Sequence, residues 1–521
     1  MKSLYRCGIV SLMLAFFLSS LFLTGCSNKE VKTTADVQKA EKQKLVIGVG
    51  RDFYYGPSDP TCVHGSTNVW ESLTYLDNEL NPQPQLAESW EVSPDGKVWT
   101  FRLRKNVKFH DGSPFNAEIA VLNMKRLLKH PKVDARQIYG DLKDVRVTNE
   151  YTIQFEHNTP VPEFPSMIAY FNSAMLSPAS FDEQGIIKEP IGTGPFVFKK
   201  YVKDDSVILA ANKDYWGKKP LLEEVVFKFI PDANTRLAAL QDGEVDVLSD
   251  VGAVMPEQAA IIKKDKKLEL KTQAVATTHY LFMNKNRDMF KNNDLFKAVS
   301  MAINRQELVD KILEGYGKSG QSVITPLATK WLNEEVAPQY DLQEAKKLAQ
   351  TVLKDTKPQV TLLVNSGLSN RWPYKSIAEI LQYQLAQIGL QVKIEMVDGG
   401  AWNKQLKAGN YDLSLTPFTL MTGEPNFFFS THMLSTGDLN KNRSYGYKNN
   451  EADKLISQAA VEKDAGKRRQ LYLELQKIAA EQGPLTPIYH DITLYACNIK
   501  VKNFELDASF KPDLAKVEIT N

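Results

Sequence analysis

The chain has 521 residues, of which 43% are apolar and 24% charged, a composition typical of a globular protein with two or three domains. Lys and Arg together number 64, and Asp and Glu number 62. This near balance argues against a nucleic-acid-binding protein, which usually carries an excess of basic residues. Four cysteines (Cys7, Cys26, Cys62 and Cys497) are too few to form a disulfide framework in so long a chain.

The N-terminal segment, residues 1–26, is predicted to be an export signal. Lys2 and Arg6 precede an apolar run that ends at Leu23, a pattern typical of a secretory signal peptide. The run closes with "LTGC", which resembles the lipobox of bacterial lipoproteins. That resemblance implies that Cys26 is lipidated and anchors the protein at the extracytoplasmic face of the cell membrane. The alternative, an uncleaved membrane anchor, is disfavoured because the run is short for a membrane span.

Residues 27–43 contain no aromatic residue and are rich in charged and small polar residues. This composition predicts a flexible tether between the membrane and the folded body. No later segment offers about 18 uninterrupted apolar residues. The lipid is therefore expected to be the only contact of the mature chain with the membrane.

The body mixes predicted strands and helices, which indicates the α/β class. Residues 98–104, "VWTFRLR", alternate between apolar and polar side chains and predict a half-buried strand. Residues 359–365, 374–389 and 391–397 predict a strand, a helix and a second strand parallel to the first. Further strands are predicted at 44–50, 145–157 (two), 224–230, 485–498 and 501–506, and helices at 117–129, 294–313 (two) and 451–482, the last interrupted near Gly466.

Motifs of enzymes are absent or incomplete. The chain has no H-E-x-x-H and no G-x-S-x-G. "GYGKSG", 315–320, ends like a phosphate-binding loop, but Ile312 stands where that loop needs glycine. "GVGRDFYYG" follows the first strand, but its third glycine is misplaced for a dinucleotide-binding motif. An enzyme therefore has no positive support.

Six blocks in order resemble the peptide/nickel family of solute-binding proteins, which serve ATP-driven (ABC) importers of bacteria. They cover essentially the whole chain from residue 44 onward. The blocks are "LAESWEVSPDGKVWTFRLRKNVKFHDGSPFNAE" (86–118), "IGTGPF" (191–196), "NKDYWGKKP" (212–220), "TRLAALQDGEVDV" (235–247), "KAVSMAINRQELV" (297–309) and "GEPNFFF" (423–429).

The resemblance implies a bilobed periplasmic-binding-protein-like fold of the cluster C type, with ligand held in the cleft between lobes that close about a hinge. Lobe I is expected at residues 44–274, with an inserted subdomain at about 82–190. Lobe II is expected at 275–485, and residues 486–521 return to lobe I. The implied partners are the permease subunits of an ABC importer, no nucleic acid is expected to bind, and the protein is expected to be a monomer.

Several residues in these blocks are assigned structural roles. His110 stands beside the turn sequence Asp111-Gly112 and is interpreted as a hydrogen-bonding residue of a loop. Gly192 and Gly194 are interpreted as glycines that permit tight backbone turns beside a strand. Tyr215 and Trp216 are interpreted as packing residues.

The ligand is less clearly indicated. Peptide-binding members hold the ammonium group of the ligand with an aspartate a few residues before the "G-D-P" block, but Met421-Thr422 stand there in this chain. Arg371 could bind a ligand carboxylate, with Trp372 as a stacking wall. The alternative for Arg371 is an arginine of a surface loop. The predicted ligand contacts are Tyr54, Tyr55, His64, Tyr139, Arg371, Trp372, Met421, Thr422 and His432.

A histidine from each lobe favours a metal complex as ligand, since imidazole suits nickel. His64 lies in the loop after the first strand, and His432 follows the cleft block of lobe II. We predict that the two histidines face each other across the closed cleft and that Cys62 binds no metal. The arginine and the tryptophan of nickel-binding members are not reproduced, since Phe171-Asn172 and Thr419-Leu420 stand at those positions. Solvated or hydrogen-bonded loop histidines are the alternative.

The sequence thus predicts an extracytoplasmic solute-binding lipoprotein that is not an enzyme and has no resident cofactor, with nickel or a nickel complex as the transported ligand. The main alternative is an oligopeptide- or dipeptide-binding protein of an ABC importer. A secreted hydrolase, a chaperone or a sensor is the alternative from a different class, and no motif supports it. Cys62 and Cys497 both fall in lobe I; a disulfide between them remains an alternative to the expected free thiols.

Overall fold

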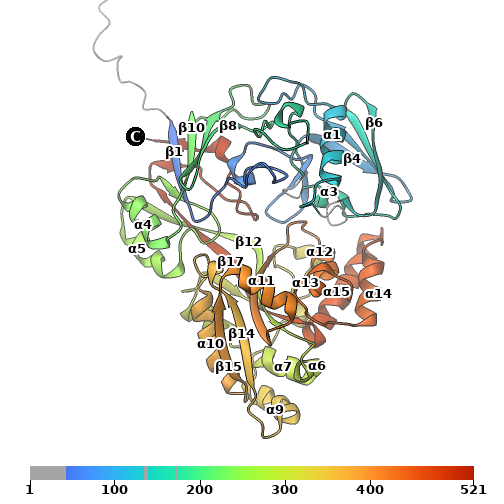
Figure 1. Ribbon diagram of the computed structural model, residues 1–521, viewed down its shortest axis with the longest axis vertical. Coiled ribbons are helices and arrows are strands. Elements are labelled where there is room, and N and C mark those ends of the chain that lie inside the picture. Colours follow the sequence, from blue (N-terminus) through green and yellow to red (C-terminus); the bar gives the residue numbers. More distant parts are fainter. Residues whose placement is uncertain (1–42, 134–138, 170–172, 521) are drawn as a thin grey trace, which may run out of the picture. The chain divides into compact units, whose positions relative to one another are not determined.

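The computed structural model describes residues 43–133, 139–169 and 173–520 (Figure 1). The predicted signal peptide, Cys26 and the tether up to residue 42 lie outside the described residues, as do Phe171 and Asn172. Of the helices in the described ranges, none is both long and apolar enough to cross a bilayer.

The main sheet has eleven strands. They are β1 (Lys44–Val49), β8 (Phe196–Val202), β9 (Ser206–Ala211), β10 (Glu224–Phe229), β11 (Val247–Leu248), β12 (Leu268–Met283), β13 (Gly317–Ser319), β14 (Gln359–Asn365), β15 (Gln391–Val397), β16 (Leu413–Thr419) and β17 (Leu485–Asn498). Their order is β15-β14-β16-β12-β17-β11-β1-β10-β9-β8, and β13 pairs with β17 off this path. The sheet thus joins the first, middle and last parts of the chain.

The long antiparallel strands β12 and β17 connect the two halves of this sheet. At one end β17 pairs with β11 of the first half, and at the other end β12 pairs with β16 of the second half. The register between β12 and β17 shifts between Ala274 and Thr278 and again between His279 and Tyr280. Such irregularities bend a strand locally, so the connection between the halves is a curved pair of strands.

Lobe I contains the half of the sheet built from β1 and β8 to β11. Its core gathers apolar residues of β1, of the sheet strands and of the chain end, and both cysteines, Cys62 and Cys497, lie buried in it as free thiols. The remaining elements of this half are α4 (Ala233–Gln241), α5 (Ala259–Lys264), and two small ladders, β2 (Thr74–Leu76) with β3 (Pro82–Pro84) and β18 (Val501–Lys502) with β19 (Glu518–Ile519).

A separate four-stranded sheet lies within the region predicted as the inserted subdomain. Its order is β4 (Ala87–Val92), β5 (Val98–Leu103), β7 (Thr152–His157) and β6 (Leu142–Asn149), and α1 (Ala117–Leu128) and α3 (Phe164–Met167) accompany it. In β5 the side chains of Trp99, Phe101 and Leu103 are buried and that of Arg102 is exposed, which confirms the predicted half-buried strand. Buried residues of this sheet and of α1 form one core, and Figure 1 shows α1 beside the sheet.

Lobe II is built on β14, β15 and β16 with helices around them (Figure 1). The predicted strand–helix–strand unit is confirmed, since β14 and β15 are parallel and α10 lies between them in the chain. The helices are α6 (Asp288–Lys291), α7 (Asn293–Ala302), α8 (Arg305–Lys311), α9 (Leu342–Leu353), α10 (Tyr374–Ala386), α11 (Gly399–Ala408), α12 (Pro425–His432), α13 (Asp438–Asn442), α14 (Asn450–Ala459) and α15 (Ala465–Gln482).

One predicted strand is largely wrong. Of residues 501–506, only Val501 and Lys502 pair as a strand. Phe504 and Leu506 are buried in the core of lobe I. Their apolar character therefore reflects packing from a loop and not a continuing strand.

Gly192 and Gly194 lie just before β8, beside a strand as predicted, but they permit close packing of two backbone segments and not the predicted tight turns. A Cβ atom at Gly192 would lie 2.1 Å from the carbonyl oxygen of Val69, and one at Gly194 would lie 2.2 Å from that of Asn68. His110 accordingly makes a hydrogen bond through Nε2 with the Gly194 carbonyl, at 2.9 Å. This block is therefore structural.

Candidate functional site

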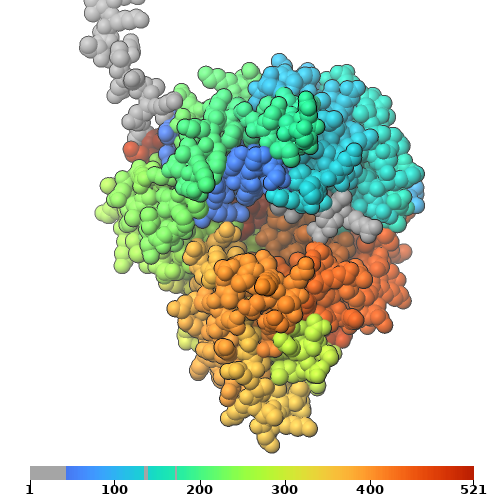
Figure 2. Space-filling view, viewed as in Figure 1, coloured from blue at the N-terminus to red at the C-terminus, as the bar shows by residue number. Residues whose placement is uncertain are grey.

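Lobe II contacts lobe I where the loop before α10 meets the loop after β11. A Cβ atom on Gly252 would lie 2.3 Å from both the Cα atom and the carbonyl oxygen of Arg371, and Gly252 has φ +65°. Both the contact and the backbone conformation therefore require glycine. Figure 2 shows lobe I atoms of the N-terminal segment, in blue, facing orange atoms of lobe II across an indentation of the surface.

Four side chains define what we call the arginine site: Arg51, His64 and Asp250 from lobe I, and Arg371 from lobe II. Arg51 follows β1 and donates Nε to Oδ2 of Asp250 and Nη2 to Oδ1, each at 2.7 Å. Burial raises the pKa of Asp250, but Arg51 outweighs that effect, so that the pKa is lowered overall. The pair therefore remains ionised, and Asp250 is fully engaged by Arg51.

His64 completes the lobe I side of the arginine site. Its Nδ1 accepts the backbone N–H of Ser66 at 3.1 Å, and its Nε2 lies 3.0 Å from Nη2 of Arg51. Burial, followed by the charge of Arg51, lowers the pKa of His64 to about 3. The imidazole is therefore neutral at physiological pH, and its acceptor nitrogen, Nδ1, is engaged by the N–H of Ser66.

Arg371 contributes a positive charge without a counter-charge of its own. Within the described part of the chain, its guanidinium makes no hydrogen bond or ion pair. Burial, followed by the positive charge of Arg51, lowers its pKa, while Asp250 and Tyr55 act in the opposite direction. With Asp250 committed to Arg51, the arginine site carries one excess positive charge at the contact between the lobes.

The loop that carries Gly252 is held by a fully buried arginine. Arg236, in α4, donates to the carbonyl oxygens of Ile230, Pro231 and Gly252 at 2.7 to 2.9 Å. A guanidinium with several carbonyl partners fixes the backbone that it bridges. The surface that lobe I offers to Arg371 is therefore preorganised.

The other predicted ligand residues fall into three groups. Tyr55 lies at the arginine site, with its ring edge toward His64, while Tyr54 stacks on Tyr201 at 4.1 Å. Met421 and Thr422 precede Gly423, where a Cβ atom would lie 2.3 Å from the Leu80 carbonyl oxygen of lobe I. Tyr139, Trp372 and His432 are buried in cores.

The surroundings of these three buried residues are specific. Tyr139 lies in the core that the four-stranded sheet shares with α1. The indole N–H of Trp372 donates to Asp491 at 2.9 Å, and its ring packs edge-on against His279. Trp372 therefore supports the loop of Arg371 from behind, in the core of lobe II.

His432, at the end of α12, is fully buried among aromatic rings. It stacks on Phe428 at 4.7 Å and meets Phe418 at an angle of 90°. Its Nδ1 lies 3.2 Å from the Phe428 carbonyl oxygen, and burial lowers its pKa to about 3. The described residues include no group of three or more His, Cys, Asp and Glu side chains that could hold a metal ion.

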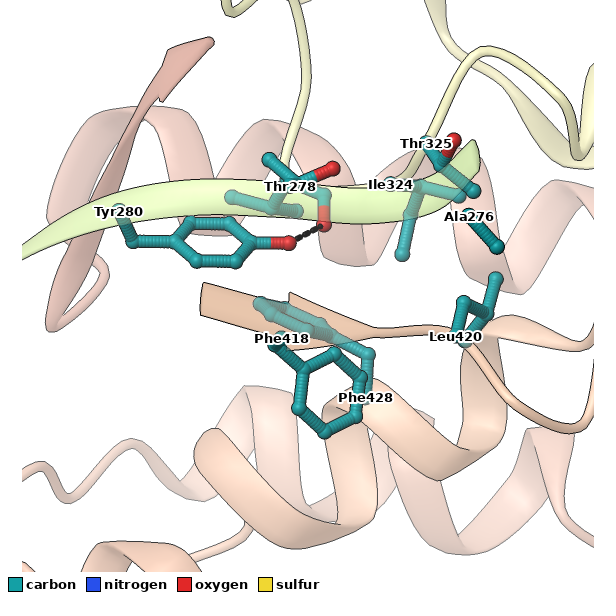
Figure 3. A pocket seen from close by; sticks show the side chains of 9 residues that line it. Ala276, Thr278, Tyr280, Ile324, Thr325, Phe418, Leu420 and Phe428 are labelled. Atoms are coloured by element: carbon teal, nitrogen blue, oxygen red, sulfur yellow. Dashed lines mark hydrogen bonds between the residues drawn. The ribbon is translucent and has the colours of Figure 1, made fainter. Parts of the chain in front are cut away.

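The rings around His432 border a small hollow in lobe II (Figure 3). It has no room for a water molecule, and Figure 3 shows Tyr280 and Thr278 on β12 opposite Phe418 and Phe428. The hydroxyl of Tyr280 donates to the carbonyl of Val323 at 2.8 Å. The hollow is therefore lined mainly by apolar side chains, and the hydroxyl of Tyr280 at its edge is already hydrogen-bonded within the protein.

Sequence reasoning missed Arg51 and Asp250. These residues are 199 positions apart, so no local motif announces their pairing. The one available signal was an arginine directly after the first strand, at a strand end where α/β folds place ligand sites.

Comparison with known proteins identifies the class to which this geometry belongs. The family model for "Bacterial extracellular solute-binding proteins, family 5 Middle" matches residues 81–440, more than half of the chain. The chain belongs to this family. It is a solute-binding protein of the kind that works with ABC importers, and its relatives are binding proteins and not enzymes.

Individual relatives carry names of peptide-binding and nickel-type proteins. The di/tripeptide-binding protein 1 of Pseudomonas aeruginosa (strain UCBPP-PA14) is 31% identical over 463 residues, which cover 81% of this chain and 83% of the relative. The Helicobacter pylori protein DppA, solved with the peptide STSA, is 26% identical with a TM-score of 0.77 and covers 92% of this chain and 98% of its own.

NikA of Brucella suis, solved with Fe(III)-EDTA, has a TM-score of 0.82 at 22% identity and covers 92% of this chain and 100% of its own. At that identity the likeness shows the fold alone. The bilobed periplasmic-binding-protein fold is thereby confirmed. The predicted class of solute-binding protein is thereby confirmed, and the names of the curated relatives are mainly those of peptide-binding proteins.

Proposed function

We propose that this chain captures short peptides, or related small carboxylates, and delivers them to the permease subunits of an ABC importer. The observation that carries the proposal is Arg371, a partly buried cation at the lobe contact without an acidic partner among the described residues. A ligand carboxylate would supply the missing charge in a bidentate pair, which is the preferred geometry between arginine and a carboxylate. The peptide-binding names of the relatives agree with this assignment.

The opposite end of the ligand is expected to differ from that of a free peptide. The segment Leu420-Met421-Thr422 contains no carboxylate, and Leu420 and Thr422 are buried. A buried ammonium group without a carboxylate is costly. We therefore expect a ligand whose amino end is blocked, neutral or left exposed to water.

Nickel or a nickel complex is the weaker candidate ligand. Nε2 of His432 has no hydrogen-bond partner among the described residues, but the side chain is fully buried against Phe418 and Phe428, so a metal would reach it only if this packing opened. His64 would have to give up its contacts with Ser66 and Arg51. A peptide carboxylate at Arg371 requires neither change.

The cellular setting is part of the same proposal. We propose lipidation at Cys26, a tether at 27–43, and a monomeric body on the extracytoplasmic face of the membrane. Residues 44–274 and 486–521 would form lobe I and residues 275–485 lobe II. The bend in β12 and β17 would serve as the hinge about which ligand drives closure.

Affinity selection tests the ligand class. The purified protein is incubated with an equimolar mixture of di- and tripeptides, with the same mixture as C-terminal amides, and with nickel plus free histidine, and bound masses are read by native mass spectrometry. We expect bound peptides from the mixture of free acids and few bound peptides from the mixture of amides. We expect no bound nickel–histidine complex. Arg371→Ala should lose the acid ligands, whereas His432→Ala should retain them. If the protein binds the nickel–histidine complex and no peptide from either mixture, the proposal is overturned.

A further inference from the structure

A second polar cluster lies between the lobes, distinct from the arginine site. We call it the carboxyl cluster and define it by Glu163, Glu424, Asn426 and Arg468. Glu163 precedes α3 in the inserted subdomain of lobe I, whereas Glu424 and Asn426 stand at the start of α12 and Arg468 lies in α15 of lobe II. The two glutamates and Arg468 are at most 6% exposed.

The cluster bridges the lobes through direct contacts. Nδ2 of Asn426 donates to Oε1 of Glu163 at 2.9 Å, which joins lobe II to lobe I. Nε of Arg468 lies 3.6 Å from Oε2 of Glu424. The two carboxyl groups also interact with each other across the boundary.

The charges of the cluster do not balance when both glutamates are ionised. Arg468 is the buried cation, Lys330 acts on Glu424 from lobe II, and Tyr472 of α15 faces both carboxyl groups as a neutral phenol. The charge of Glu424 acts on Glu163 more strongly than that of Arg468, and burial followed by the charge of Glu424 raises the pKa of Glu163 to about 8. Burial also raises the pKa of Glu424.

Hydrogen-bond geometry gives independent support for a proton in the cluster. Among the described residues, Oε2 of Glu163 and Oδ1 of Asn426 are buried without a hydrogen-bond partner, and the donor that faces Oε2 of Glu424 is Nε of Arg468, at 3.6 Å. Two carboxylates cannot hydrogen-bond to each other, because neither carries a donor. One proton on either group provides that donor and removes one of the two negative charges.

We propose that the closed body holds one proton, shared between Glu163 of lobe I and Glu424 of lobe II, and releases it when the lobes separate. Separation exposes both carboxyl groups to water, where glutamates titrate at about 4.3. Closure therefore takes up a proton wherever the pH lies above that value and below the value of the closed pair, and it becomes less favourable as the pH rises through this range. The site is a proton-binding latch of the fold, independent of which ligand the arginine site takes.

Single-molecule energy transfer between dyes at Leu122→Cys on α1 and Tyr383→Cys on α10 measures the closed-to-open ratio without ligand. Both side chains are exposed, and Cys62 and Cys497 are buried, so in a chain with Cys7→Ser and Cys26→Ser the dyes label the two new thiols. For wild type we expect the ratio to fall between pH 5 and pH 8, by at most about tenfold per pH unit, and to level off above.

Glu163→Gln and Glu424→Gln each leave one carboxylate opposite Arg468. Both variants should be more closed than wild type at pH 8 and change less than about threefold between pH 5 and pH 9, whereas Glu183→Gln, at an exposed position of lobe I, should behave like wild type. A wild-type ratio that does not change with pH would overturn the proposal. So would glutamine variants that fold, by their melting curves, and keep the wild-type slope. Because no ligand is added, this result is independent of the peptide assignment.

Discussion

The two polar clusters between the lobes have opposite charge imbalances. In the arginine site, Arg51 and Arg371 share a single carboxylate, Asp250, which is taken up by Arg51 in two hydrogen bonds. In the carboxyl cluster, Glu163 and Glu424 share a single buried guanidinium, that of Arg468. One cluster therefore lacks an anion and the other lacks a cation.

This difference shows how two incomplete sites can serve different purposes in one interface. A carboxylate-bearing ligand can enter the arginine site and complete it, so that the contact between the lobes depends on cargo. The carboxyl cluster is buried and can be completed by a proton, which needs no space. Closure in our account is therefore strongest when both a ligand carboxylate and a proton are supplied.

The largest effect is expected from breaking the ion pair between Arg51 and Asp250, in which the two charges balance. Asp250→Asn should leave Arg51 without its counter-charge and lower the free energy of unfolding by about 3 kcal/mol in urea titrations. The matched control is Glu91→Gln, which removes the partner of Arg102 in an exposed pair at 2.9 Å and should cost less than about 1 kcal/mol. Equal losses for the two variants would show that Arg51 does not need Asp250.

Lys285 carries a buried positive charge that has no acidic partner among the described residues. Its Nζ has no hydrogen-bond partner among the described residues and lies 4.7 Å from the centre of the Phe296 ring. Burial lowers its pKa to about 8, so the unfolded chain binds the extra proton up to about pH 10.5, and stability rises with pH between these values.

Lys285→Met should remove that rise and stabilise the protein by about 2 kcal/mol at pH 7, measured by urea titration at several pH values. Lys311, an exposed lysine of α8, provides the matched control as Lys311→Met. If Lys285→Met and Lys311→Met show the same pH profile, the lysine is not desolvated in solution.

Gly252→Ala is expected to weaken the contact between the lobes by more than it lowers the stability of the fold. Alanine at φ +65° costs about 1 kcal/mol wherever it occurs, but here its Cβ atom would also strike the backbone of Arg371. The closed state should be lost preferentially, so that ligand binds at least about tenfold more weakly by calorimetry.

Gly56→Ala is the control for that substitution. Gly56 has φ +85°, and a Cβ atom added there would meet no other atom within 4 Å, so this position carries the backbone cost alone. The variant should lower the melting temperature by a similar amount and leave ligand affinity unchanged. Equal affinities for Gly252→Ala and Gly56→Ala would mean that Arg371 and Gly252 separate in the bound form.

The elements of the fold were largely predictable because their signals are local. The alternation in β5 and the strand–helix–strand order of β14, α10 and β15 appear directly in the sequence. The site was less predictable, because its charges meet across long separations: Arg51 pairs with Asp250, and Glu163 interacts with Glu424. A single sequence also cannot show that Trp372 and His432 are buried, since their neighbours come from other elements.

The central claim is that Arg371 binds the carboxylate of the transported ligand. The most direct measurement is calorimetry of wild type and Arg371→Ala with a peptide recovered by the affinity selection and with the C-terminal amide of the same peptide. We predict that wild type prefers the acid by about 100-fold, and that Arg371→Ala binds acid and amide equally. An Arg371→Ala variant that retains the full preference for the acid would contradict the account.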